Sequence, residues 1–167
     1  SPEFSQRVML SVVKPKSYLL YEYKMSGHVE VIAKMLSLRN VAAISAPAAT
    51  VLKWANYERF KQDLKKSMSE LSELNAPEVE KIVEETKKKG LEDVARDLHT
   101  RLSKKVSKAT LIFGISSLSR SKWESLRNFM RWKEGGERFT NLYVGSEIGP
   151  FASSLSVGDD YEVAKEN

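Results

Sequence analysis

The chain has 167 residues, a net charge of +5 and no cysteine, so it is long enough for one domain with its own core and excludes disulfides, thiolate metal sites and a cysteine nucleophile. No apolar run reaches the roughly 20 residues that a membrane-spanning helix requires, and the N-terminus shows no signal-peptide pattern. We therefore expect a cytoplasmic protein without a membrane partner.

The N-terminal region offers two interpretations. Residues 1–4 have the sequence of a cloning-site remnant and are left out of the fold prediction. Two short apolar runs follow, at residues 7–13 and 18–23, with Pro15 between them. They predict either a β-hairpin or a coil followed by a helix that begins at Ser17.

Residues 29–49 combine a helical pattern with a segment of small side chains. The apolar residues of 29–38 recur at steps of three and four, which predicts an amphipathic helix. Residues 41–49 are rich in alanine, which favours a buried helix segment. Ser45 and Pro47 suit the start of the helix that follows.

A long helix is predicted over residues 47–74. From Phe60 onward its apolar residues recur about every 3.5 positions, the spacing of a helical hairpin or a short coiled coil. Such a face must be buried, either internally or against a partner. Its residues form the predicted partner interface: Phe60, Leu64, Met68 and Leu71.

The clearest helix boundary lies between the next two helices. Asn75 can cap a helix and Pro77 suits its first turn, so a helix should begin here, run to Lys89 and stop at Gly90. The following pattern, over residues 91–113, has the longest apolar stripe in the chain. It predicts the central packing helix.

The C-terminal third is expected to be more varied. A break at residues 116–121 precedes a further helix over residues 122–133, and residues 138–144 are a candidate strand. Residues 159–167 look like an acidic flexible tail. The predicted fold is therefore mainly α, a single domain over residues 5–158. It is a helical bundle built on long antiparallel helices, with a small β-hairpin or sheet formed by the N-terminal runs and residues 138–144.

Basic charge concentrates in residues 86–138, which hold fourteen basic and six acidic side chains. On the central helix, Arg101, Lys104 and Lys108 lie about 110° around from the apolar stripe, and Trp132 is the candidate for an exposed ring that stacks on bases. A one-sided basic stripe can follow a phosphate backbone, and the alternative is a solvated helix face. The predicted nucleic-acid-binding residues are Arg101, Lys104, Lys105, Lys108, Arg120, Arg127, Arg131, Trp132 and Lys133.

Catalytic and metal-binding signatures are missing from the sequence. There is no HExxH, CxxC, GxxxxGK[ST], GxGxxG or GxSxG motif. His28 and His99, the only histidines, have no spacing that suggests a metal site. We therefore expect no enzyme activity, no catalytic residue, no metal and no cofactor.

The leading hypothesis from the sequence is a small, basic, helical nucleic-acid-binding subunit of a larger ribonucleoprotein or DNA-processing assembly, with RNA or single-stranded DNA as the ligand. The small subunits of archaeal CRISPR effector complexes are an example of this class, although the sequence carries no motif of theirs. Many charged residues and only two glutamines, Gln6 and Gln62, are typical of hyperthermophile proteins. The alternative is a helical module for protein–protein interaction or self-association, without direct nucleic-acid contact.

Overall fold

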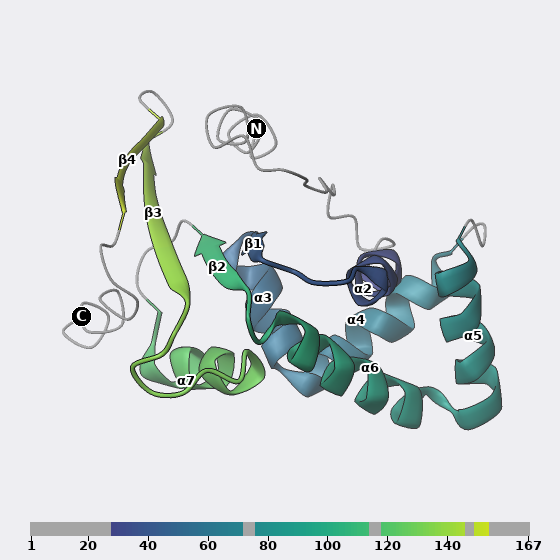
Figure 1. Ribbon diagram of the computed structural model, residues 1–167. Helices are drawn as coiled ribbons and strands as arrows, with labels where there is room; N and C mark the ends of the chain where they lie inside the picture. The colour runs from purple at the N-terminus through teal and green to yellow at the C-terminus, as the bar shows by residue number, and fades with distance from the viewer. Residues whose placement is uncertain (1–27, 72–75, 114–117, 146–148, 154–167) are drawn as a thin grey trace.

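The computed structural model describes residues 28–71, 76–113, 118–145 and 149–153 (Figure 1). The expected N-terminal hairpin or helix and the acidic tail lie outside the described residues. The helices are α2 (His28–Ser37), α3 (Ala48–Ala55), α4 (Tyr57–Ser69), α5 (Pro77–Lys89), α6 (Leu91–Val106) and α7 (Arg120–Phe129). The strands are β1 (Ala43–Ser45), β2 (Thr110–Phe113), β3 (Phe139–Gly145) and β4 (Gly149–Ser153).

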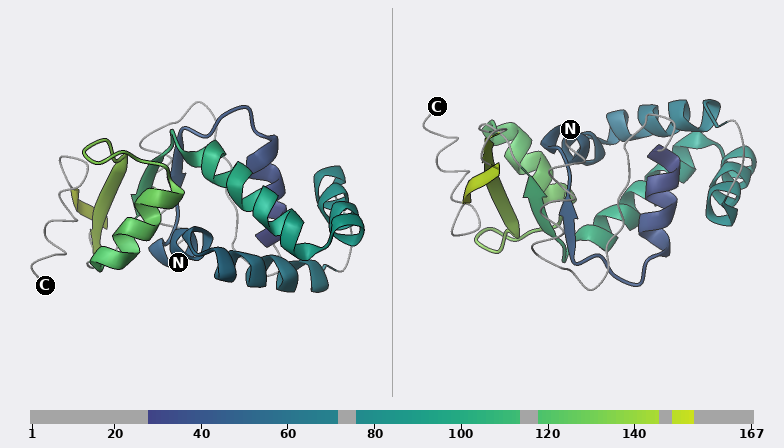
Figure 2. Two further views of the ribbon diagram at one scale, coloured as in Figure 1. Left: turned by 90° about the horizontal axis from the view of Figure 1, so that it is seen from below. Right: turned by 90° about the horizontal axis from the view of Figure 1, so that it is seen from above.

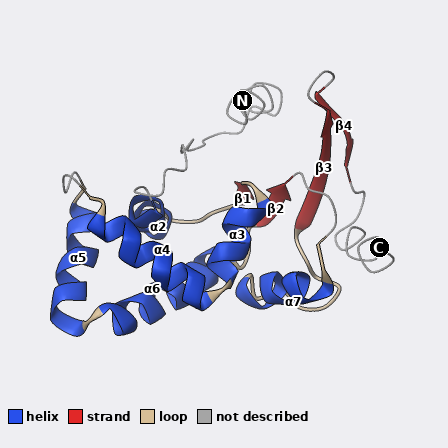
Figure 3. Cartoon of the chain, turned by 180° about the vertical axis from the view of Figure 1, so that it is seen from behind, coloured by secondary structure: helices blue, strands red, loops and turns tan. Residues whose placement is uncertain are grey.

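A small sheet forms one end of the molecule (Figures 1 and 3). Strands β1, β2 and β3 are neighbours in that order and parallel, and β4 pairs antiparallel with β3. The register aligns Ile44 with Leu111, and Leu111 with Phe139. These three side chains are buried. Trp123 of α7 contacts the Phe139 ring edge-on at 5.0 Å, and α7 in turn packs against α3.

The helical part is organised around α6. This helix contacts α2, α4 and α5. Leu98 and Leu102, on the apolar stripe of α6, are almost fully buried. In both views of Figure 2, α5 lies at the end of the molecule opposite the strands. The C-terminal end of α6 leads directly into β2, so it is the point where the helical part meets the sheet.

The prediction of one long helix over residues 47–74 is wrong in one respect, because the helix is interrupted at Asn56. The backbone of Asn56 is extended, and its side chain accepts a hydrogen bond from the Arg59 N–H at 3.0 Å. Asparagine is a favoured helix cap, so this bond begins α4 as a separate helix and redirects the chain after α3.

Two other segments predicted as helix form strands. Residues 43–45 belong to β1, within the alanine-rich segment, and residues 110–113 form β2 instead of extending the central helix. A short apolar run fits either a buried strand or a buried helix, since its periodicity is the same in both. The pairing of β1 with β2, which is a tertiary contact, determines that both segments are strands.

Other boundaries agree with the prediction. Helix α5 ends at Lys89, and Gly90 follows with φ of 88°, a conformation that favours glycine. The strand expected at residues 138–144 is present as β3, but in a mainly parallel sheet. The mainly α class is confirmed. A bundle of long antiparallel helices stays a prediction, since α6, the longest helix among the described residues, has 16 residues. No helix in the described segments is long and apolar enough to cross a bilayer.

Candidate nucleic-acid interface

The last turn of α6 and the turn that follows it carry two of the predicted cations, Lys104 and Lys108. Lys104 and Lys108 are exposed, and neither forms an ion pair within the described part of the chain. Cations are favoured at a helix C-terminus, so their position has a local electrostatic explanation as well as a possible role in binding. The segment between α7 and β3 brings further cations to this end of α6.

Arg131 follows α7 in a conformation that is unusual for its residue type. Its φ is 55°, and it is the only non-glycine residue with positive φ in the described segments. The Arg131 N–H bonds to the Asn128 carbonyl at 3.2 Å, and the Trp132 N–H bonds to the Arg127 carbonyl at 3.1 Å. This pair of bonds is the Schellman motif that ends many helices, in which glycine normally occupies the left-handed position. An L-residue there costs roughly 1–2 kcal/mol.

The Arg131 side chain is anchored on α6. Its Nε donates to the Ser103 hydroxyl oxygen at 3.0 Å, and the Ser103 hydroxyl donates to the Phe129 carbonyl at 2.5 Å. Ser103 is therefore a buried bridge between α6 and the end of α7. The bond to Ser103 holds the Arg131 guanidinium beside the last turn of α6, which also carries Lys104.

A further cation, Arg138, binds the same end of α6. Its Nη1 donates to the Lys108 carbonyl oxygen at 2.9 Å. Sequence analysis missed Arg138, although it lies in the same basic segment, because it was assigned to the candidate strand. We call the resulting group the α6-end cluster; it consists of Lys104 and Lys108 at the end of α6, Arg131 and Arg138, which bond there, and Lys133, which follows Arg131 by two residues in the sequence. None of these five cations forms an ion pair with a described acidic residue.

The other predicted basic residues have partners within the described part of the chain. Arg101 pairs with Asp97 at 3.1 Å. It precedes Ser103 by two residues, so the two side chains point in directions about 160° apart around the helix. Arg120 pairs with Glu124 at 3.0 Å. These two predicted residues are therefore each paired with a carboxylate on their own helix.

Arg127 and Lys105 support the fold directly. Arg127 lies 4.0 Å from Glu137, a carboxylate that is buried, and so compensates its charge. Lys105 reaches the carbonyl oxygen of Leu38 beyond the end of α2, at 2.5 Å. These side chains tie the α7–β3 connection and α2 to the rest of the molecule.

Trp132, predicted as a surface ring, is buried and lies with its ring centroid 6.2 Å from that of Trp123. The prediction extended a helix through residue 133, whereas the helix ends at Phe129. The left-handed turn at Arg131 folds Trp132 back onto α7, so its ring is not available for stacking on bases.

The predicted partner interface is largely filled from within the chain. Phe60 and Leu64 are fully buried, and α4 packs against α2 and α6. Met68 and Leu71 are half-buried near the end of α4. Only these two residues of the predicted face retain surface for a second protein.

His28 is buried in the core and His99 is half-buried. His28 is fully buried, and desolvation lowers its pKa to about 4, against a smaller opposing effect of Asp63. Burial likewise lowers the pKa of His99, whose Nε2 lies 2.8 Å from the Trp54 carbonyl oxygen. Phe60 contacts both rings edge-on. No group of three or more His, Asp or Glu residues suited to a metal ion occurs in the described segments.

Comparison with known proteins gives no further assignment: no protein-family model, curated protein sequence or solved structure matches the chain significantly.

Proposed function

We propose that the protein binds RNA or single-stranded DNA through the α6-end cluster, as a non-catalytic subunit of a larger assembly. The observation that carries the proposal is Arg131. A guanidinium is kept at a backbone position where glycine is less strained, and it is fixed by Ser103 in the last turn of α6. Residues with a strained backbone conformation cluster at functional sites, which makes Arg131 a candidate functional residue.

The chemistry of the cluster suits a phosphate backbone. Arginine presents several N–H donors in a planar fork, and lysine supplies a mobile point charge. Because the five cations come from α6, from the turn after it and from the α7–β3 connection, the cluster combines charges that are distant in sequence. Phosphate contacts of this type bind without reading sequence, and their affinity falls steeply with salt.

The test compares two charge-reversal variants that have the same net charge. In the first variant Lys104, Lys108 and Lys133 are changed to Glu, and in the control Lys81, Lys87 and Lys89 of α5 are changed to Glu. All six lysines are exposed, and α5 lies at the far end of the molecule from the strands. Affinity for a fluorescent single-stranded RNA and a single-stranded DNA is measured by anisotropy at several salt concentrations.

We expect the first variant to lose binding by about 100-fold or more and the control to retain most of it. The slope of log K against log salt should fall by about 0.7 for each phosphate contact removed. Equal losses in the two variants would show that only net charge matters. No binding by the unaltered protein to either nucleic acid would exclude the proposal.

The alternative function is a protein–protein interaction module. It rests on Met68 and Leu71, the half-buried residues at the end of α4. The full burial of Phe60 and Leu64 within the chain leaves little of the predicted interface for it. Sedimentation velocity of the whole chain, alone and with Met68 changed to Glu, measures whether this surface mediates self-association.

A further inference from the structure

The α6-end cluster carries a positive charge that the described residues leave uncompensated. Its five cations are exposed, and none forms an ion pair with a described acidic residue. Of the two carboxylates in the connection between α7 and β3, Glu137 lies 4.0 Å from Arg127, which leaves the exposed Glu134 beside the cluster. Exposed charges of one sign raise the local concentration of anions. The cluster therefore favours an anionic segment of any origin, including one from the same chain.

The last residues of the sequence carry the opposite charge. Residues 159–167, which we call the acidic tail, contain four acidic residues and one lysine and have a net charge of −3. The acidic residues are Asp159, Asp160, Glu162 and Glu166. The acidic tail lies outside the described residues, but β4 defines the direction in which the chain leads into it. Blocks of like charge of this kind often serve as interaction tails.

Strand β4 directs the chain towards the cluster. It runs antiparallel to β3 (Figure 1), so its last residue, Ser153, lies towards the beginning of β3, where it pairs with Leu142. Arg138 immediately precedes β3 and lies about 13 Å along the strand from Leu142, at roughly 3.3 Å per residue. Asp159 follows Ser153 by six residues, which gives it a reach of up to about 20 Å. The acidic tail is therefore long enough to contact the cluster.

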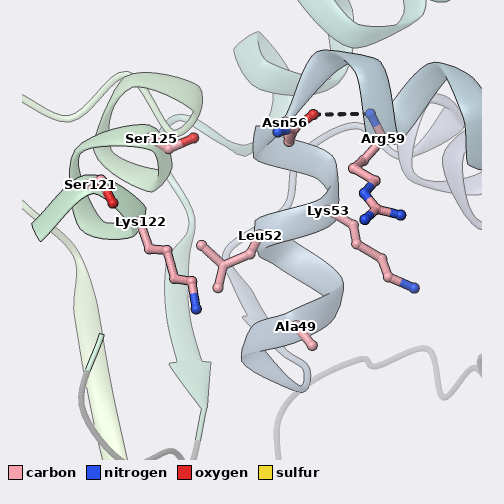
Figure 4. A pocket seen from close by; sticks show the side chains of 8 residues that line it. All are labelled: Ala49, Leu52, Lys53, Asn56, Arg59, Ser121, Lys122 and Ser125. Atoms are coloured by element: carbon pink, nitrogen blue, oxygen red, sulfur yellow. Dashed lines mark hydrogen bonds between the residues drawn. The ribbon is translucent and has the colours of Figure 1, made fainter. Parts of the chain in front are cut away.

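A hollow lined by basic residues elsewhere offers the tail a poorer site. It lies between the α3–α4 junction and α7, and its cations are Lys53, Arg59 and Lys122. Figure 4 shows Lys122 on the α7 side of α3, whereas Lys53 and Arg59 lie on the opposite side. These three cations do not converge on one group of carboxylates. In the α6-end cluster, by contrast, Arg131 and Arg138 are both bonded to the end of α6.

We propose that the acidic tail binds the α6-end cluster of its own chain and thereby occupies the surface proposed for nucleic acid. The competition rests on the proposed function, whereas the tail contact itself does not. A tethered segment is present at an effective concentration in the millimolar range, which compensates for the weakness of exposed ion pairs. A nucleic-acid strand displaces the tail because every nucleotide of the strand carries a phosphate. The tail therefore lowers the apparent affinity for nucleic acid, most of all for short strands.

The tail contact is tested on the full chain without nucleic acid. Because the sequence has no cysteine, Ala164→Cys provides a single attachment site for a nitroxide label, which broadens the NMR signals of nearby amides. We expect broadening at the end of α6 and in the α7–β3 connection but not in α5, at the opposite end of the molecule from the strands (Figure 2). The broadening should decrease with salt and disappear when Lys104, Lys108 and Lys133 are changed to Glu. Absent broadening, or equal broadening in α5, would overturn the proposal.

The competition is tested by removing charge from the tail. In the tail variant Asp159 and Asp160 are changed to Asn and Glu162 is changed to Gln. In the control Glu78 and Glu80 of α5 are changed to Gln and Asp93 of α6 is changed to Asn. The three control residues are exposed, and the two variants have the same net charge. Circular dichroism checks that both are folded, and affinity for a short single-stranded RNA is measured by anisotropy.

We expect the tail variant to bind the RNA about three- to tenfold more tightly than the unaltered protein at low salt, and the control to change by less than about twofold. The difference should shrink as salt is raised. Equal gains in the two variants would show that only net charge matters and would overturn the competition. No binding by any of the three proteins would exclude the proposed function. The label would still report the tail contact, so the two failures are distinguishable.

Discussion

The Nε of Arg131 donates a hydrogen bond to the Oγ of Ser103 at 3.0 Å, and this contact brings the end of α7 to the last turn of α6. It joins a residue with φ of 55° to a hydroxyl that is buried and also bonds the Phe129 carbonyl. The basic side chains of two distant segments are thereby combined in one cluster, which no property of either segment alone produces.

Two substitutions at Arg131 separate backbone strain from side-chain function. Arg131→Gly and Arg131→Ala both remove the guanidinium, but only glycine adopts the left-handed conformation without steric cost. We expect Arg131→Gly to be more stable than Arg131→Ala by about 1 kcal/mol in urea unfolding. Both should weaken nucleic-acid binding equally. A glycine variant that binds as well as the unaltered protein would show that Arg131 does not contact the ligand.

Ser103→Ala tests the bridge itself. The change removes a buried hydroxyl that serves as both donor and acceptor, so we expect a loss of about 1–2 kcal/mol in the free energy of unfolding. Nucleic-acid affinity should fall as well, because the Arg131 guanidinium is no longer held. Thr at this position retains the hydroxyl and serves as the control. Unchanged stability of Ser103→Ala would contradict the bridging role.

His28 predicts a loss of stability in mild acid. Its pKa is about 4 in the folded protein, with desolvation as the main cause, Asp63 opposing it and Lys53 adding to it. The usual value in an unfolded chain is about 6.5. The unfolded state therefore takes up the proton first. Stability is fully present above pH 6.5 and is lost as the pH falls towards 4, by about 3 kcal/mol.

The measurement is urea unfolding at several pH values between 4 and 7 for the unaltered protein and for His28→Gln. The glutamine variant lacks the titrating ring, so its stability should fall less over this interval. His99, whose pKa is also lowered by burial, contributes the same sign and remains in both proteins. Identical pH profiles for the two proteins would exclude His28 as a source of the dependence.

The capping side chain of Asn56 should contribute measurably to stability. Asn56→Ala removes the cap of α4 and should lower the free energy of unfolding by about 1 kcal/mol. Asn56→Asp keeps a capping oxygen and should preserve stability. Equal stability of the alanine and aspartate variants would show that the cap contributes nothing.

The sequence by itself determined the features that depend on neighbouring residues. The end of α5 at Lys89 follows from Gly90, and the apolar stripe of α6 follows from residue spacing. The concentration of basic charge in residues 86–138 is also a sequence property. Local steric and electrostatic preferences act over one or two helical turns, so such features are visible without the fold.

Only the tertiary structure decided which basic residues are brought together. β1 and β2 became strands because they pair in parallel across four intervening helices, a contact that no local pattern encodes. Trp132 was buried, and Arg131 was placed against Ser103, by a left-handed turn that a non-glycine residue rarely adopts. Helical periodicity assumes that the helix continues, so it misplaces every side chain beyond the residue where the helix ends.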